Sequence, residues 1–290
     1  RTDNNPEALL SEQVSAALYM AHPYGIPIIG WEHEIRGLTT EDALDFYRQH
    51  YAPNNAILVV AGDITAEKLR PLAEQFYGVI PAGEVAPRER VKEPPAIAPR
   101  RITHRDARVR QPSYRRSYVV PSSATAEPGM AVAMDVLSQI LGAGSTSRFY
   151  RALVVDQAIA ASSGAFYSGS GLDYGRFMLY GSPVAGQDLE TIETAMDLVI
   201  DDLLEGGITD EELERAKSNM MADIVYARDN QRTMAQAFGA ALTTGLTIDD
   251  VMTYPDEVEK VTSEDVNKAA RQIFESKAHV TAHLLPEQGS

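Results

Sequence analysis

The histidine pair His279 and His283 has the spacing that comes nearest to a metal site in this sequence. Residues four apart share one face of a helix, where two imidazoles can bind one ion. The stretch His279–Leu285 is typical of a strand, however, and on a strand four steps of ~3.3 Å place the two side chains ~13 Å apart. That separation is too large for one ion, so we predict no metal site at this pair.

The remaining histidine-containing stretches favour structural roles. The cluster Glu32-His33-Glu34 is interpreted as a solvated loop. His22, which precedes a proline, is interpreted as a capping or packing residue, and His50 as a helical residue that packs or faces solvent. None of these patterns predicts a ligand set for a metal.

Two glycine-rich stretches lack the contexts that nucleotide-binding or catalytic loops need. Gly142-x-Gly144 follows a predicted helix rather than a strand, and no lysine follows it, so it predicts a helix C-cap and turn. Ser168 and Ser170 lie in a hairpin sequence without the Gly-x-Ser-x-Gly pattern of a nucleophile elbow. The sequence therefore supports neither dinucleotide binding nor serine hydrolysis.

The composition is that of an ordinary globular protein with an excess of acid. Of 290 residues, 44% are hydrophobic and 23% charged, and 26 basic against 41 acidic side chains give a net charge of −15. Nucleic-acid binding would need a strong basic patch, and we interpret the densest basic stretch, Arg100–Arg116, as a solvated face. There is no cysteine, which excludes disulfides and thiolate metal sites, and no apolar run reaches the ~20 residues of a membrane span.

Hydrophobic periodicity predicts an α+β fold, because strands and helices come in blocks rather than in strict alternation. Helices are predicted over residues 6–18, 40–51, 67–76, 130–141, 189–204 and 210–226, with shorter ones after these. Strands are predicted over residues 57–61 (covered on both faces), 102–109, 115–120 and 279–285, with a hairpin formed by residues 158–170 and 174–182.

Prolines mark one domain boundary. Residues 81–100 contain five prolines and suit neither a helix nor a central strand. We therefore expect residues 1–92 to belong to a first domain, residues 93–100 to be the linker and residues 101–290 to form a second domain.

The two domains carry an internal repeat. Leu38–Gly62 aligns without gaps with Val261–Leu285, at an offset of 261 − 38 = 223, and each copy reads as a capped helix, a turn and an apolar strand. The second copy begins near Arg101, so its counterpart would lie at 101 − 223 = −122. We expect the first domain to be represented only by its C-terminal half, with on the order of a hundred residues preceding this sequence.

The motifs around this repeat resemble those of the pitrilysin/insulinase family of zinc metallopeptidases, the inverzincins. They run in order along most of the chain: HPYG-x-P-x-x-G from His22, LT-x-ED from Leu38, Y-x-P-x-N from Tyr51, VVAGD from Val59 and LG-x-G-x-x-SR-x-Y-x-x-L from Leu141. The sequence is most similar to the bacterial two-domain members and to the mitochondrial-processing-peptidase-like group. The resemblance implies two homologous α+β domains, each a mixed, mainly antiparallel sheet with packed helices.

The resemblance also implies a zinc-dependent peptidase. The family binds zinc through an H-x-x-E-H helix and a later glutamate, and the motif glutamate takes a proton from the zinc-bound water. This sequence contains no H-x-x-E-H. We therefore expect zinc in the intact protein, with its ligands upstream of Arg1, and neither zinc nor activity in this chain alone.

Within this chain the resemblance assigns substrate contacts rather than catalytic residues. In the family an arginine at the position of Arg148, and a tyrosine thirteen residues later, hold the substrate near the zinc site; a guanidinium suits a carboxylate or carbonyl. The tyrosine position falls on Ala161. Tyr167, six residues further on, is a candidate substitute on the same strand face. The alternative for Arg148 is an ion pair with an acidic surface residue.

Three functions follow from these expectations. The first is the C-terminal part of a zinc metalloendopeptidase that encloses peptides between two domains. The second is a non-catalytic partner subunit that contributes Arg148 and a binding surface to a zinc-bearing homologous subunit. The third is a structural scaffold, as in the respiratory-complex relatives of the family. Bacterial relatives are often exported, so we expect the periplasm or cell envelope.

Overall fold

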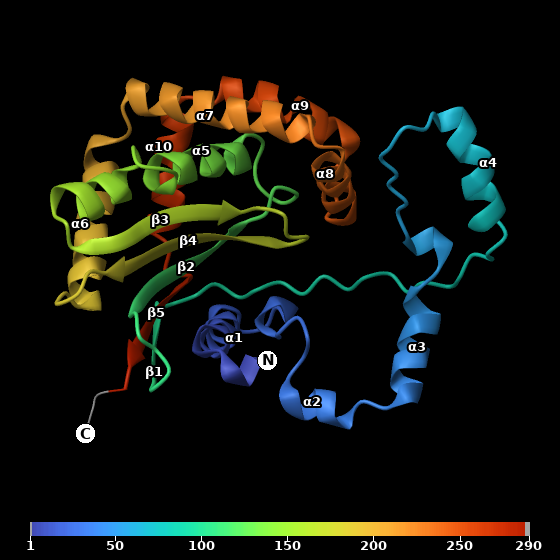
Figure 1. The fold of residues 1–290 in the computed structure, drawn as a ribbon, viewed down its shortest axis with the longest axis horizontal. Helices are drawn as coiled ribbons and strands as arrows, with labels where there is room; N and C mark the ends of the chain where they lie inside the picture. Colours follow the sequence, from blue (N-terminus) through green and yellow to red (C-terminus); the bar gives the residue numbers. More distant parts are fainter. Residues whose placement is uncertain (1, 288–290) are drawn as a thin grey trace.

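The computed structural model describes residues 2–287, and the sheet in this part of the chain is mixed and five-stranded (Figure 1). Its α-helices are α1 (Pro6–Leu18), α2 (Glu32–Gly37), α3 (Thr40–His50), α4 (Ala66–Phe76), α5 (Met130–Gly142), α6 (Leu189–Gly206), α7 (Asp210–Arg228), α8 (Gln231–Thr243), α9 (Ile248–Lys260) and α10 (Ser263–Phe274). Its strands are β1 (Arg100–Asp106), β2 (Ser113–Pro121), β3 (Ala160–Ser168), β4 (Tyr174–Pro183) and β5 (His279–Pro286). Short 3-10 turns cover Thr2–Asn4, Pro23–Gly25 and Pro53–Asn55, and a π-helix covers Tyr150–Asp156.

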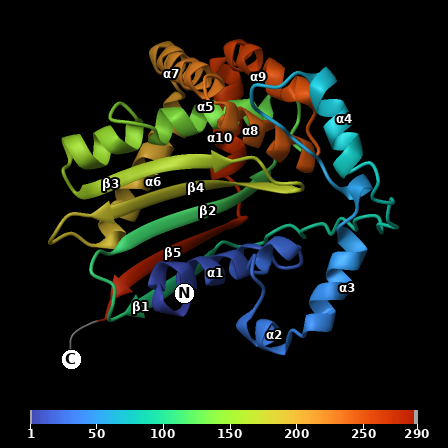
Figure 2. The same cartoon turned by 45° about the vertical axis from the view of Figure 1, so that its right-hand side comes forward.

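The sheet has the order β1-β5-β2-β4-β3, with β1 parallel to β5 and the other pairs antiparallel. Helices α5 and α6 pack against one face, α10 packs on both of these helices, and α7 and α9 form an outer layer (Figures 1 and 2). The α+β class and the mixed, mainly antiparallel sheet are confirmed. We call residues 100–287 the sheet region and residues 2–99 the N-terminal segment.

Helix α1 belongs to the N-terminal segment but packs on the sheet region, on the face opposite α5 (Figure 1). Its apolar stripe Leu10, Val14 and Leu18 is buried against β5. The helix begins where the Asn5 side chain accepts hydrogen bonds from two backbone amides, and it ends before the His22-Pro23 step, as predicted. The imidazole of His22 is buried and accepts a hydrogen bond from the Tyr24 amide, so it has the capping role expected of it.

The two copies of the internal repeat share their helix start. Helix α3 begins with a capping box in which Asp42 accepts from the Thr39 amide at 2.8 Å, and α10 begins with the same box between Thr262 and Asp265 at 3.0 Å. The C-terminal halves of the copies differ. Residues 279–286 form β5, whereas residues 56–62 form no strand.

The predicted strand over residues 57–61 is therefore wrong for this chain, and the reason is physical. A strand exists only where neighbouring strands satisfy its backbone groups. β5 lies between β1 and β2, but no strand within residues 2–287 pairs with residues 57–61, whose apolar side chains stay exposed. Figure 1 shows α3 and α4 standing apart from the sheet, and neither helix has a buried residue.

Two smaller predictions also need correction. Glu32-His33-Glu34 starts the short helix α2 rather than a loop, because Glu34 accepts a hydrogen bond from the Trp31 amide at the helix start; the cluster is exposed, as expected. The Arg100–Arg116 stretch is not a uniformly solvated face. Its alternating residues on β2 point to both sides of the sheet, and Arg116 is only 9% exposed under α6.

Candidate functional site

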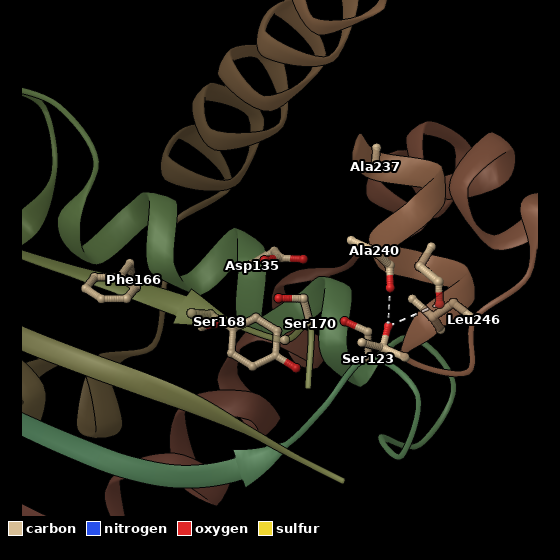
Figure 3. A pocket seen from close by; sticks show the side chains of 12 residues that line it. Ser123, Asp135, Phe166, Ser168, Ser170, Ala237, Ala240 and Leu246 are labelled. Atoms are coloured by element: carbon tan, nitrogen blue, oxygen red, sulfur yellow. Dashed lines mark hydrogen bonds between the residues drawn. The ribbon is translucent and has the colours of Figure 1, made fainter. Parts of the chain in front are cut away.

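A cavity of about 460 Å³ with both polar and apolar lining opens where the tip of the β3–β4 hairpin approaches the first turns of α5 and the C-terminal half of α8 (Figure 3). Hydroxyl groups and one carboxylate line one part of it, and small apolar side chains of α8 line the other. The lining residues are Ser123, Asp135, Phe166, Tyr167, Ser168, Gly169, Ser170, Ala237, Ala240, Ala241, Thr244 and Leu246. We call this cavity the Asp135 pocket.

Asp135 interrupts the apolar stripe of α5, between the fully buried Met134 and Val136. Its Oδ2 accepts a hydrogen bond of 2.9 Å from the Tyr254 hydroxyl on α9. Burial raises the pKa of Asp135 to about 6. The hydrogen bond from Tyr254 lowers this pKa, but by less than burial raises it. Burial also raises the pKa of Tyr254, so this hydroxyl stays a donor at neutral pH.

Tyr167 lies on β3 and lines the Asp135 pocket. Its hydroxyl donates to the Pro121 carbonyl oxygen at 2.8 Å, and burial raises its pKa above the ordinary value. The hairpin tip packs closely here, because a Cβ at Gly169 would meet the Ser123 hydroxyl oxygen at 2.5 Å. Thr244 donates to the Ala240 carbonyl oxygen at 2.8 Å, so its hydroxyl hydrogen is engaged within α8 (Figure 3).

Arg148 lies elsewhere, beyond the C-terminal end of α5. Its guanidinium donates to both carboxylate oxygens of Glu212, at 2.7 and 2.8 Å, and to the Gly207 carbonyl oxygen at 2.8 Å; Asp202 lies at 3.3 Å. Burial alone would raise the pKa of Glu212, but the ion pair with Arg148 outweighs it and holds that pKa below the ordinary value. The arginine thus joins the α6–α7 turn to the chain after α5.

The structure does not bring Arg148 and Tyr167 together. None of the hydrogen-bond partners of Arg148 lines the Asp135 pocket. The alternation that we used to relate Ala161 to Tyr167 is also broken. A β-bulge between Ala160 and Ser162 leaves Ala161 without a partner on β4, so the period of two does not run through it. A substrate contact by either Arg148 or Tyr167 stays a prediction.

A second group of charged side chains is packed between the sheet and α6. Glu193 accepts from Arg101 at 2.6 Å and from Arg116 at 2.8 Å, and lies 3.1 Å from the imidazole of His283; Arg116 also donates to Asp197 at 2.5 Å. Burial would raise the pKa of Glu193, but these hydrogen bonds together hold it well below the ordinary value. The partners satisfy one another, which is typical of a structural network.

The histidines do not assemble a metal site in the part of the chain that the structure describes. His279 and His283 lie on β5, as the strand prediction requires, and within residues 2–287 there is no group of three or more His, Asp or Glu side chains arranged to hold an ion. His22 lies 3.4 Å from Asp173 and caps a turn. The described residues therefore do not fit a catalytic zinc ion, and no catalytic step is assigned to them.

Sequence reasoning did not find Asp135. The available signal was its position, because it is the one charged residue of a thirteen-residue helix and stands among apolar neighbours. Burying a carboxylate at such a position costs free energy unless the group is paired. A buried carboxylate with a shifted pKa is therefore a candidate functional residue.

The free-energy cost of burying the ionised Asp135 carboxylate leads to a prediction about stability. Its folded-state pKa of about 6 lies above the ordinary aspartate pKa of 3.8, so protonation favours the folded state. The resulting contribution is present below pH 3.8 and is lost as the pH rises through 6. Asp135→Asn keeps an acceptor for Tyr254 but carries no charge, and we expect it to stabilise the protein at pH 7.5 by up to about 3 kcal/mol.

Urea unfolding at pH 7.5 and pH 4.5 measures this effect. The difference in unfolding free energy between Asp135→Asn and the wild type should be smaller at pH 4.5, because the wild-type carboxyl is then largely protonated in the folded state. A variant that is equally stable to the wild type at pH 7.5 would contradict a buried, costly carboxylate.

The sequence of this chain is similar to those of known peptidases. The sequence profile described as the Peptidase M16 inactive domain matches residues 37–220. The chain is 26% identical to the zinc protease PqqE of Helicobacter pylori over 99% of this chain and 64% of that protein. It is 26% identical to the probable mitochondrial-processing peptidase subunit beta of Schizosaccharomyces pombe, over 95% of this chain and 61% of that protein.

The fold agrees with the sequence match. A crystal structure of a protease from Helicobacter pylori superposes with a TM-score of 0.89 at 24% identity, covering 98% of this chain and 68% of that one. The chain spans just under two thirds of the length of the PqqE protein. None of the helices within residues 2–287 is long and apolar enough to cross a membrane. The matched profile covers more than half of the chain, which therefore belongs to the peptidase M16 family and contains its inactive domain.

Proposed function

We propose that this chain is the part of a zinc-dependent metallopeptidase that forms the wall of the peptide-binding chamber, with the zinc site provided by residues outside it. The zinc proteases among its relatives support the peptidase role. The matched profile, which describes an inactive domain, and the lack of H-x-x-E-H in the sequence support a wall rather than a catalytic centre.

The observation that carries the proposal is the exposed apolar surface of the N-terminal segment. Side chains of α3, α4 and residues 57–60 are left in water, although large contiguous apolar patches normally mark interfaces. The exposed side chains include Leu44, Phe46, Tyr47, Ile57, Leu58, Val59, Val60, Leu72 and Phe76. We propose that residues 1–92 complete a first domain with strands that pair with residues 57–61, that residues 93–100 link the domains, and that residues 101–290 are the second domain.

The internal repeat supports this arrangement. In the second copy, α10 is followed by β5, which lies between a parallel and an antiparallel strand. The same surroundings would convert residues 57–61 into a central strand and bury α3, whose sequence matches α10. Substrate contacts by Tyr167 and Arg148 remain part of the proposal. The position of Tyr167 on the Asp135 pocket supports the first, and the family motif supports the second.

The test is a peptidase assay of the complete gene product against this 290-residue chain. We expect the complete product to cleave unstructured peptides, to lose at least a hundredfold of its activity on chelation and to regain it with zinc. The isolated chain should cleave nothing. A complete product without H-x-x-E-H would contradict the catalytic role.

A non-catalytic partner subunit is the second candidate, favoured by the similarity to a processing-peptidase subunit. In that case the exposed apolar surface would still be covered within the complete chain, but activity would require a homologous subunit that carries the motif. Co-purification with such a subunit, and activity only after mixing, distinguish this function from the first. For the location, we propose the periplasm or cell envelope, with which the absence of cysteine is compatible.

A further inference from the structure

The Asp135 pocket contains a negative charge without a matching cation. Of the twelve residues that line it, Asp135 is the one charged side chain. Its Oδ2 is held by Tyr254, while within residues 2–287 no protein donor reaches its Oδ1. Figure 3 shows this carboxyl group on the side of α5 that faces α8, above Ser168 and Ser170. A hydrogen-bond acceptor is thus open to a ligand inside the cavity.

The rest of the lining suits a cation with an aliphatic stem. The hydroxyls of Ser123, Ser168 and Ser170 offer further acceptors to a group with several N–H donors, such as an ammonium or guanidinium. Ala237 and Leu246 give the opposite wall apolar surface, against which methylene groups can pack. The volume of about 460 Å³ lies within the range of small-ligand pockets.

Electrostatics favour the same ligand. An ionised carboxylate that is partly withdrawn from water gains most from a direct, hydrogen-bonded cation. The net charge of −15 adds a long-range attraction for positively charged ligands. A bound anion or a purely apolar group would leave this carboxylate without a partner inside the pocket.

We propose that the Asp135 pocket binds a positively charged group of a peptide, either a lysine or arginine side chain or a free N-terminal amine. The inference rests on the proposed function for the source of the peptide. The binding itself needs neither zinc nor catalysis, so it is tested on the 290-residue chain as it stands.

The experiment titrates the chain with four probes, followed by NMR or calorimetry at pH 7.5. N-acetyl-lysine methylamide tests the side chain, and N-acetyl-norleucine methylamide is its uncharged match. A short lysine-free peptide with a free amine tests the N-terminus, with its N-acetylated form as the match. We expect saturable binding of at least one cationic probe and at least tenfold weaker binding of its match; the probe that binds identifies the source of the charge.

Variants and pH connect the binding to Asp135. Asp135→Asn should weaken the binding of the cationic probe at least tenfold. Asp256→Asn, an exposed change on α9, should leave that binding unchanged. The titratable groups that face Asp135 are Tyr254 and Tyr167, whose raised pKa values keep them neutral, so lowering the pH from 7.5 to 5.0 should weaken binding about tenfold through the carboxyl alone.

Three results would overturn the inference: no saturable binding of any cationic probe, equal binding of a charged probe and its match, or unchanged binding in Asp135→Asn. Because that variant is expected to be more stable than the wild type at pH 7.5, loss of binding cannot be ascribed to unfolding. Failure of the zinc assay with intact cation binding would refute the proposed function but leave the pocket. An active complete protein without cation binding would refute the inference about the pocket but leave the proposed function.

Discussion

The Arg116→Ala variant is expected to lose about 3 kcal/mol of unfolding free energy. It removes a buried guanidinium from the buried Glu193, which keeps Arg101 and His283, and from the partly exposed Asp197. Arg116 donates to Glu193 at 2.8 Å and to Asp197 at 2.5 Å, and reaches Thr281 on β5 at 3.2 Å. Burial by itself would lower the pKa of this guanidinium, but the ion pair with Asp197 outweighs it and raises the pKa, so Arg116 is always charged.

The neighbouring arginine is a matched control. Arg115 points to the opposite face of β2, where it pairs with the half-exposed Glu7 at 3.2 Å, and exposed pairs of this kind contribute about 0–1 kcal/mol. Urea unfolding of both variants gives the two losses. Equal losses for Arg115→Ala and Arg116→Ala would show that the network under α6 is not a stabilising element.

Gly142→Ala should be the second strongly destabilising change, with a loss of about 3 kcal/mol or more from overpacking. A Cβ at position 142 would overlap the backbone nitrogen and carbonyl oxygen of Ala165 on β3. The last turn of α5 therefore lies directly on the strand, and only a residue without a side chain permits this approach. The sequence prediction of a helix C-cap missed this reason for the glycine.

Gly206→Ala is the control for this prediction. Gly206 ends α6, and a Cβ added there would meet nothing within 4 Å, so alanine should be neutral or slightly stabilising, by about 0.5–1 kcal/mol. Thermal or urea unfolding compares the two variants. If Gly142→Ala unfolds like the wild type, the tight contact between α5 and β3 does not exist in solution.

Local signals in the sequence predicted the helices well because those signals are short-range. The Thr39 and Thr262 boxes and the Asn5 cap are complete within four residues of chain, and the structure confirms α3, α10 and α1. The hairpin of β3 and β4 was likewise predicted from adjacent residues. The family resemblance and the α+β class are confirmed by the sequence profile and by the fold.

Features that depend on distant residues were not predictable in the same way. Residues 57–61 have the composition of a strand, but pairing decides whether a strand forms, and no local pattern contains its partners. The burial of Arg116 depends on Glu193, which is 193 − 116 = 77 residues away. The bulge at Ala161 changes the face of the residues before it, and Asp135 becomes a pocket residue only once α8 and the hairpin approach α5.

The position of β5 has a consequence for how the protein is made. This strand is inserted between β1 and β2, and the ladder pairs Arg100 with Val280, which are 280 − 100 = 180 residues apart. Strands β2, β4 and β3 can pair with one another earlier, but β1 can join the sheet only after residues 279–286 have left the ribosome. The edge of β2 that β5 covers stays open until then. Contacts between residues so far apart in sequence form slowly. Until β5 is inserted, the unpaired strand edges are prone to aggregation, and chaperones would protect the chain most at this stage.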